Sequence, residues 1–144
     1  MTSREGGGHI GMDQQIEMRD GYLYAKLSGI FHIDEAKRLY SNVQEEADRR
    51  SAGRVLIDCL QLRGVVDIAD RFQYGAFVAE QQLASPQRRS RRTAYVGREP
   101  PFDKKRFGEM VATNRMAKVK RFESAEAALR WLGVDADGQE GAAC

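Results

Sequence analysis

The stretch that most constrains how this chain folds lies at residues 54–67, near the middle of its 144 residues. It begins with Val55, Leu56 and Ile57, which follow one another without the polar alternation of a half-exposed strand. A short, continuous run rich in β-branched residues predicts a strand that is buried on both faces. Helices must then cover both sides of the sheet. The second half of the stretch predicts a turn into a helix, with Asp67 as the N-cap residue.

The residues before this stretch predict an antiparallel lead-in. Residues 14–19 and 22–28 both alternate apolar and polar side chains, and Asp20 and Gly21 separate the two runs. Two alternating runs across an Asp-Gly step are a strong hairpin signal. A helix should begin near residues 32–34, because apolar residues then recur at helical spacing. Its buried face would consist of Ile33, Ala36, Leu39, Tyr40, Val43 and Ala47.

The helix after the central strand should span residues 68–83, and it carries two separate apolar groups. At about 100° per residue, these groups fall on different faces of the helix. The main stripe, which we expect to face the sheet, consists of Ile68, Phe72, Gly75, Ala76, Ala79 and Leu83. Tyr74, Phe77 and Val78 form the second group, which must meet another helix or a partner.

The rest of the chain continues as strands and helices in turn. The predicted elements are a loop at 86–91, a strand at 93–96, a helix at 103–114, a more exposed strand at 118–122 and a helix at 125–132. The order β-β-α-β-α-β-α-β-α predicts an α/β fold: a mixed, mainly parallel five-stranded sheet with helices on both faces. We expect a single domain at residues 14–133, between a flexible N-terminal arm at 1–13 and a flexible C-terminal tail at 134–144.

The composition narrows the possible chemistry. The two cysteines, Cys59 and Cys144, make no disulfide framework and fit a reducing compartment. The two histidines, His9 and His32, belong to no metal-ligand spacing. No apolar run approaches the ~20 residues of a membrane span, and residues 1–12 hold no signal core, so we expect a cytoplasmic protein. The chain has neither a phosphate-binding glycine loop nor a convincing catalytic triad, so we expect no cofactor, no catalytic residue and no enzyme activity.

Several segments together resemble a known family. They are the lead-in hairpin, the Val-Leu-Ile-Asp strand at 55–58 with its turn into a helix, Arg-Phe-Gln-Tyr-Gly at 71–75, Val-Gly at 96–97, Val-Ala-Thr-Asn-Arg at 111–115 and Phe-Glu-Ser-Ala-Glu-Ala-Ala-Leu-Arg-Trp-Leu at 122–132. Across residues 14–133 the chain resembles a STAS domain. It is most similar to the SpoIIAA-like bacterial proteins, whose fold is related to the CRAL-TRIO lipid-binding domains. The resemblance implies a bacterial signalling domain that works by protein–protein interaction.

The resemblance also locates a regulatory position. In STAS domains of the anti-sigma factor antagonist type, a serine at the start of the helix after the central strand is phosphorylated, and this controls binding to a kinase partner. The matching residues 65–68 are Val-Val-Asp-Ile, without serine or threonine. A phosphoserine switch at this place is therefore not available. Asp67 would either mimic a permanent negative charge at the helix N-terminus or serve as its cap.

The hypothesis that we favour is a non-enzymatic interaction or regulatory domain. Its surface would use Tyr74, Phe77 and Val78, because aromatic residues are enriched at the centre of interfaces. The partner would be another protein or a second copy of the chain, giving a homodimer. The alternative is that this group packs inside the monomer, and burial of both aromatic residues there would exclude the hypothesis.

Two other functions remain open. A small apolar or anionic ligand, or a lipid as the CRAL-TRIO relationship suggests, would bind beside the strand ends near Cys59, Asp67, Gly97 and Arg98. Residues 88–121 hold many more lysines and arginines than acidic residues. This basic C-terminal half could bind an anionic polymer or a membrane surface. Nucleic acid ranks last as a partner, because aromatic residues are few among the arginines and no reading motif is present.

Overall fold

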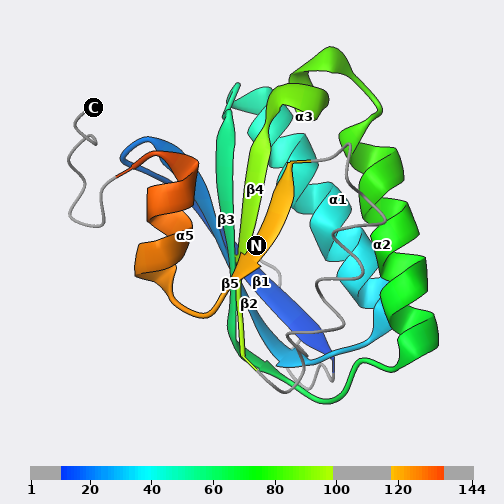
Figure 1. Cartoon of the computed structure of the whole chain (residues 1–144). Coiled ribbons are helices and arrows are strands. Elements are labelled where there is room, and N and C mark those ends of the chain that lie inside the picture. Colours follow the sequence, from blue (N-terminus) through cyan, green and yellow to red (C-terminus); the bar gives the residue numbers. More distant parts are fainter. Residues whose placement is uncertain (1–10, 99–117, 135–144) are drawn as a thin grey trace.

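The computed structural model of the chain describes residues 11–98 and 118–134. Five strands form one sheet in the order β1-β2-β3-β4-β5 (Figure 1). The strands are β1 Met12–Arg19, β2 Tyr22–Ile30, β3 Arg54–Arg63, β4 Arg92–Val96 and β5 Val119–Phe122. The helices are α1 Ile33–Arg49, α2 Ile68–Gln82, α3 Pro86–Ser90 and α5 Ala125–Leu132.

The predicted hairpin and the mainly parallel sheet are confirmed. Strand β1 pairs with β2 antiparallel, and every other neighbouring pair in the sheet is parallel. Gly21 in the hairpin turn has φ +92, a backbone conformation that favours glycine. Strand β1 starts earlier than predicted: Met12 pairs with Gly29 and its side chain is 2% exposed. The sheet therefore includes residues 12 and 13, which the sequence placed in the arm.

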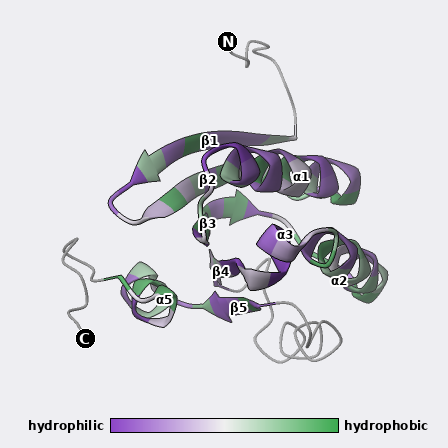
Figure 2. Ribbon diagram, turned by 90° about the horizontal axis from the view of Figure 1, so that it is seen from above, coloured by the Kyte–Doolittle hydropathy of each residue, from purple (hydrophilic) through white to green (hydrophobic). Residues whose placement is uncertain are grey.

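Strand β3 lies at the centre of the sheet and is buried on both faces, as predicted. Val55 and Ile57 belong to one core cluster, together with residues of α1 and α2. Leu56 points the other way, into a second cluster with residues of α5. Helices α1 and α2 thus cover one face of the sheet and α5 covers the other (Figures 1 and 2).

The helix ends follow local signals. The Ser124 side chain accepts a hydrogen bond from Ala127 N at 3.2 Å, and Gly133 ends α5 with φ +90. Residues 86–91 are not a plain loop, because they contain the short helix α3. Ser85 caps it by accepting from Arg88 N at 3.2 Å, and Pro86 occupies the first turn, where a missing N–H costs nothing.

Some predictions lie beyond these elements. The helix predicted at 103–114 falls outside the described residues. Of the helices that the structure describes, none combines the length and the apolar character needed to cross a bilayer.

Candidate partner-binding site around helix α2

The N-terminus of α2 is built around Asp67, which is its N-cap residue as predicted. Asp67 Oδ1 accepts a hydrogen bond from Asp70 N at 2.8 Å. The bond satisfies one of the amides that a helix leaves unpaired, and the negative charge lies at the positive end of the helix dipole. Asp67 itself is exposed, so a partner can reach it.

Large apolar side chains surround this cap. Val65 is 75% exposed, Ile68 is 48% exposed and Phe72 is 62% exposed. Ile68 and Phe72 are four residues apart and so lie on one side of α2, while Val65 lies in the turn two residues before the cap. Exposed apolar residues are ordinary when scattered, but a group of them marks an interaction site. We call Val65, Ile68 and Phe72, with Ile30, the apolar patch.

Ile30 joins the patch from the end of strand β2. It is 49% exposed. A Cβ atom placed on Gly64 would lie 3.4 Å from Ile30 Cγ2, so Ile30 packs beside the turn that leads to Val65. Gly64 has φ +102, which requires glycine and sharpens this turn. The patch therefore lies where β2 and β3 end and α2 begins.

The structure turns the predicted partner surface of Tyr74, Phe77 and Val78 largely toward the core. Val78 is 1% exposed, and Tyr74 and Phe77 are partly buried against the core. Both rings meet the Tyr40 ring edge-on, with centroid distances of 6.1 Å for Tyr74 and 6.2 Å for Phe77. The hydroxyl groups of Tyr74 and Tyr95 are 2.5 Å apart and share a hydrogen bond. Burial raises the pKa of both tyrosines.

A buried amide lies on the inward face of α2 together with Tyr74 and Val78. Gln82 is 0% exposed and continues the inward stripe of Tyr74 and Val78. Tyr40 Oη donates a hydrogen bond to Gln82 Oε1, and Gln82 Nε2 donates to the Arg88 carbonyl at 3.1 Å. A polar side chain can be buried when its hydrogen bonds are made. The inward face therefore contains a residue that a hydrophobic pattern assigns to the surface.

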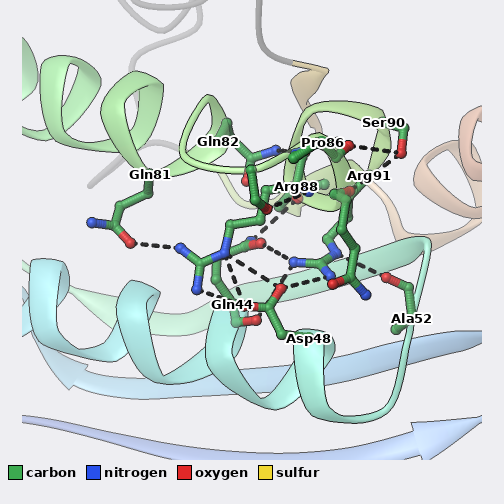
Figure 3. Close-up of polar contacts among 12 residues, drawn as sticks. Gln44, Asp48, Ala52, Gln81, Gln82, Pro86, Arg88, Ser90 and Arg91 are labelled. Carbon is green, nitrogen blue, oxygen red and sulfur yellow. Dashed lines mark hydrogen bonds and ion pairs between the residues drawn. The ribbon is translucent and has the colours of Figure 1, made fainter.

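A second buried polar group stands beside α2. The Arg91 guanidinium is fully buried. It donates to Ala52 O at 2.8 Å, to Gln44 Oε1 at 2.7 Å and to Asp48 Oδ1 at 2.9 Å (Figure 3). A buried guanidinium is tolerated because every side of it finds an acceptor. Arg91 thus fixes the end of α3 to the end of α1.

Arg88 completes this network from the opposite side. Its Nη2 donates to Asp48 Oδ2 at 2.8 Å, and its Nη1 donates to Gln81 Oε1 at 2.8 Å (Figure 3). Burial alone would raise the pKa of Asp48, but the hydrogen bonds and charges of Arg88 and Arg91 outweigh it and hold that pKa below its ordinary value. Two arginines of the basic stretch at 88–121 are therefore engaged inside the fold and do not add to a basic surface.

The opposite face of the sheet carries a different polar contact. Tyr24 Oη donates to Asp58 Oδ2 at 2.5 Å, and Leu60 N donates to Asp58 Oδ1 at 3.0 Å. The Arg19 guanidinium lies 3.6 Å from the centroid of the Tyr24 ring. Burial, with the hydrogen bond to Asp58, raises the pKa of Tyr24. Each carboxylate oxygen of Asp58 thus already accepts a hydrogen bond from within the chain.

The four residues of the predicted ligand site have different environments. Cys59 is 2% exposed, and burial raises the pKa of its thiol, which disfavours the reactive thiolate. Gly97 N donates to Phe122 O at 3.0 Å, so this amide already has an acceptor. Asp67 and Arg98 are exposed. A ligand site at these positions stays a prediction. Among the described residues, no three His, Cys, Asp or Glu side chains gather in a way that could hold a metal ion.

Comparison with known proteins identifies the fold. No protein-family model matches the chain, and no curated protein matches it in sequence. A solved structure of an anti-sigma factor antagonist from Mycobacterium paratuberculosis superposes with a TM-score of 0.56 at 15% sequence identity, over 84% of this chain and 93% of that one. An uncharacterised Shewanella loihica protein with a SpoIIAA-like fold gives a TM-score of 0.49 at 22% identity, over 92% and 98% of the two chains. The chain has the STAS-type, SpoIIAA-like α/β fold that its sequence predicted.

Proposed function

We propose that this chain is a STAS-type regulatory domain that acts by binding a protein partner through the apolar patch around Asp67. The observation that carries the proposal is Phe72, which is 62% exposed one turn into the helix that Asp67 caps. The helix backbone that carries this aromatic side chain is already ordered, so burial of the side chain by a partner costs no backbone conformational entropy. Phe72 is therefore suited to anchor an interface.

The chemistry of the patch describes the partner. Phe72, Ile68, Val65 and Ile30 offer apolar area, and Asp67 adds one negative charge among them. A matching surface would have an apolar pocket for Phe72 and a cationic group at its rim facing Asp67. An anti-sigma factor is the first partner to test, because the solved protein of similar fold is described as an antagonist of such a factor.

Asp67 also bears on regulation. The resemblance places it where anti-sigma factor antagonists carry the phosphorylated serine, and its carboxylate is fixed as the helix cap. Unlike a phosphorylated serine, an aspartate side chain needs no modifying enzyme to bring a negative group to this position. We infer that the domain's state for binding does not depend on phosphorylation at this position, and that a partner would recognise the charged form.

A site-specific cross-linking experiment tests the proposal. A photo-reactive amino acid would replace Phe72 in the full chain, in cells of the source organism, and a matched protein would carry it at Glu45, an exposed position on α1. We expect a defined protein adduct from position 72 and none from position 45. The captured protein, once purified, should bind the Phe72→Ser variant at least about tenfold more weakly than the native chain. Equal binding of both would exclude the patch as the interface.

A further inference from the structure

Strand β1 forms one edge of the sheet. Within residues 11–98 and 118–134, β1 pairs with β2 and no strand lies on its outer side. An edge strand presents a row of backbone N–H and C=O groups to any chain of matching pattern. Proteins commonly block such edges with charges. The charges on β1 therefore decide whether, and in which register, a second strand can join.

The backbone pattern shows which residues of β1 point outward. Ile30 N donates to Gly11 O at 3.1 Å, so these opposed residues belong to the hydrogen-bonded pairs of the antiparallel ladder. Pairs alternate along the ladder, so the even-numbered residues of β1 direct their N–H and C=O groups away from β2. Met12 agrees with this, because its N–H donates instead to Glu35 Oε1 at 2.7 Å. Gln14, Ile16 and Met18 therefore carry the outward groups of the strand.

The charged residues of β1 share one face of the sheet. Glu17 lies opposite Tyr24 and Arg19 lies opposite Tyr22, and both tyrosines pack on the α5 side. Because side chains alternate between faces, Asp13 joins Glu17 and Arg19 on this face. Ile16 points to the other side, toward the core that α1 covers. The face thus has a negative charge near the start of β1 and a positive charge at its end.

We propose that two copies of this chain pair through β1, antiparallel, with Ile16 opposite Ile16 at the twofold axis. In this register the outward backbone groups of Gln14 meet those of Met18 in the partner copy, so the ladder continues across the dimer. Asp13 then lies opposite Arg19 of the partner copy, twice by symmetry. These are non-hydrogen-bonded pairs, in which opposed side chains approach most closely.

The charges oppose the neighbouring registers. Sliding one strand by two residues in one direction places Asp13 opposite Glu17, and sliding it in the other places Glu17 opposite Glu17. Both arrangements put like charges across the interface, which is destabilising. Arg19 already bonds to Glu17 in its own chain at 2.7 Å. A guanidinium has five N–H donors, so it can also serve Asp13 of the partner copy.

Charge reversal tests the pairing directly. Sedimentation velocity would be measured on the full chain, up to about 1 mM, for the native protein and for Asp13→Arg and Arg19→Asp. The native chain should dimerise reversibly. Each variant places like charges at both contacts and should weaken the dimer at least about tenfold. Glu45→Arg, which changes the charge on the surface of α1 by the same amount as Asp13→Arg, should dimerise like the native chain. Circular dichroism would show that every variant is folded, since Asp13 and Arg19 are both exposed.

Mixing the two variants is the decisive step. In a mixed dimer the new Arg at position 13 faces the new Asp at position 19, and the native Arg19 faces the native Asp13. The mixture should therefore form a heterodimer although neither variant forms a homodimer. A native chain that stays monomeric, variants that dimerise as tightly as the native chain, or a mixture that stays monomeric would each overturn the proposal. Since this test uses none of the patch residues, its failure leaves the proposed partner site unaffected.

Discussion

Each face of helix α2 carries residues that depart from the usual relation between polarity and burial. The inward face includes Gln82, which is 0% exposed, and Tyr74, whose hydroxyl bonds to another buried hydroxyl. The outward face includes Phe72 and Ile68, which are 62% and 48% exposed. Burial costs a polar group little when its hydrogen bonds are made. The comparison shows that hydrogen-bond partners, and not hydrophobicity alone, decide which face of a helix turns inward.

The largest effect on stability should come from breaking the hydrogen-bond network around Arg91, beside the inward face of α2. Arg91→Ala removes a fully buried guanidinium and leaves Gln44 and the Ala52 carbonyl without this donor. We expect a loss of about 3 kcal/mol in the free energy of unfolding, measured by urea denaturation. Arg89→Ala, two residues earlier and exposed, should change it by less than about 0.5 kcal/mol. Equal losses would contradict the internal role of Arg91.

A smaller loss should follow from removing the buried amide of α2. Gln82→Leu keeps an inward side chain of similar size but leaves the Tyr40 hydroxyl and the Arg88 carbonyl without their partner. We expect a loss of about 2 kcal/mol in the free energy of unfolding. Gln87→Leu on the exposed side of α3 is the control and should be close to neutral. A Gln82→Leu protein as stable as the native one would show that apolar packing alone sets the face.

The charge of Asp67 and its capping hydrogen bond can be tested separately. Asp67→Ala removes both and should cost about 1 kcal/mol of stability, seen as a lower thermal midpoint. Asp67→Asn keeps a capping oxygen and should cost only a few tenths of a kcal/mol. If the partner recognises the negative charge of Asp67, both variants should bind the partner more weakly, and to a similar extent. Unchanged binding by Asp67→Asn would remove the charge from the proposed recognition.

The smallest effect should be a dependence of stability on pH. The pKa of Asp48 is below its ordinary value in the folded chain, so the carboxylate stabilises the fold above its unfolded pKa of about 4. This contribution is lost as the pH falls toward the folded pKa, because between the two pKa values the unfolded state binds a proton that the folded state does not. Urea midpoints measured between about pH 6 and pH 3 should fall less steeply for Asp48→Asn than for the native chain. Parallel curves would contradict this.

The fold could be predicted because its signals are local. The alternating runs around Asp20 and Gly21, the continuous run at Val55 and the cap at Ser124 each depend on a few adjacent residues. Asp67 was placed as a cap for the same reason. The fold class follows from the order of these elements.

The site could not be predicted in full because it depends on hydrogen bonds between residues that are far apart in the sequence. Gln82 can be buried because Tyr40, 42 residues away, donates to it and the Arg88 carbonyl accepts from it. Arg91 is internal because Gln44 and Ala52, 47 and 39 residues away, accept its hydrogen bonds. A hydrophobic pattern takes no account of these hydrogen bonds, so it placed Phe72 inward with the main apolar stripe of the helix. The arginines at 88 and 91, close to the predicted end of α2, were the one sequence signal of a polar interior there.

Thiol labelling tests the orientation of α2 most directly. Phe72→Cys and Val78→Cys, each in a Cys144→Ser background, would be treated with a thiol reagent under native conditions, and Cys59, which is 2% exposed, would serve as an internal buried reference. We expect the thiol at position 72 to react as fast as one in an unfolded peptide. The thiol at position 78 should react more than about a hundredfold more slowly, because it is reached only by local opening. A slower reaction at position 72 than at position 78 would contradict the account.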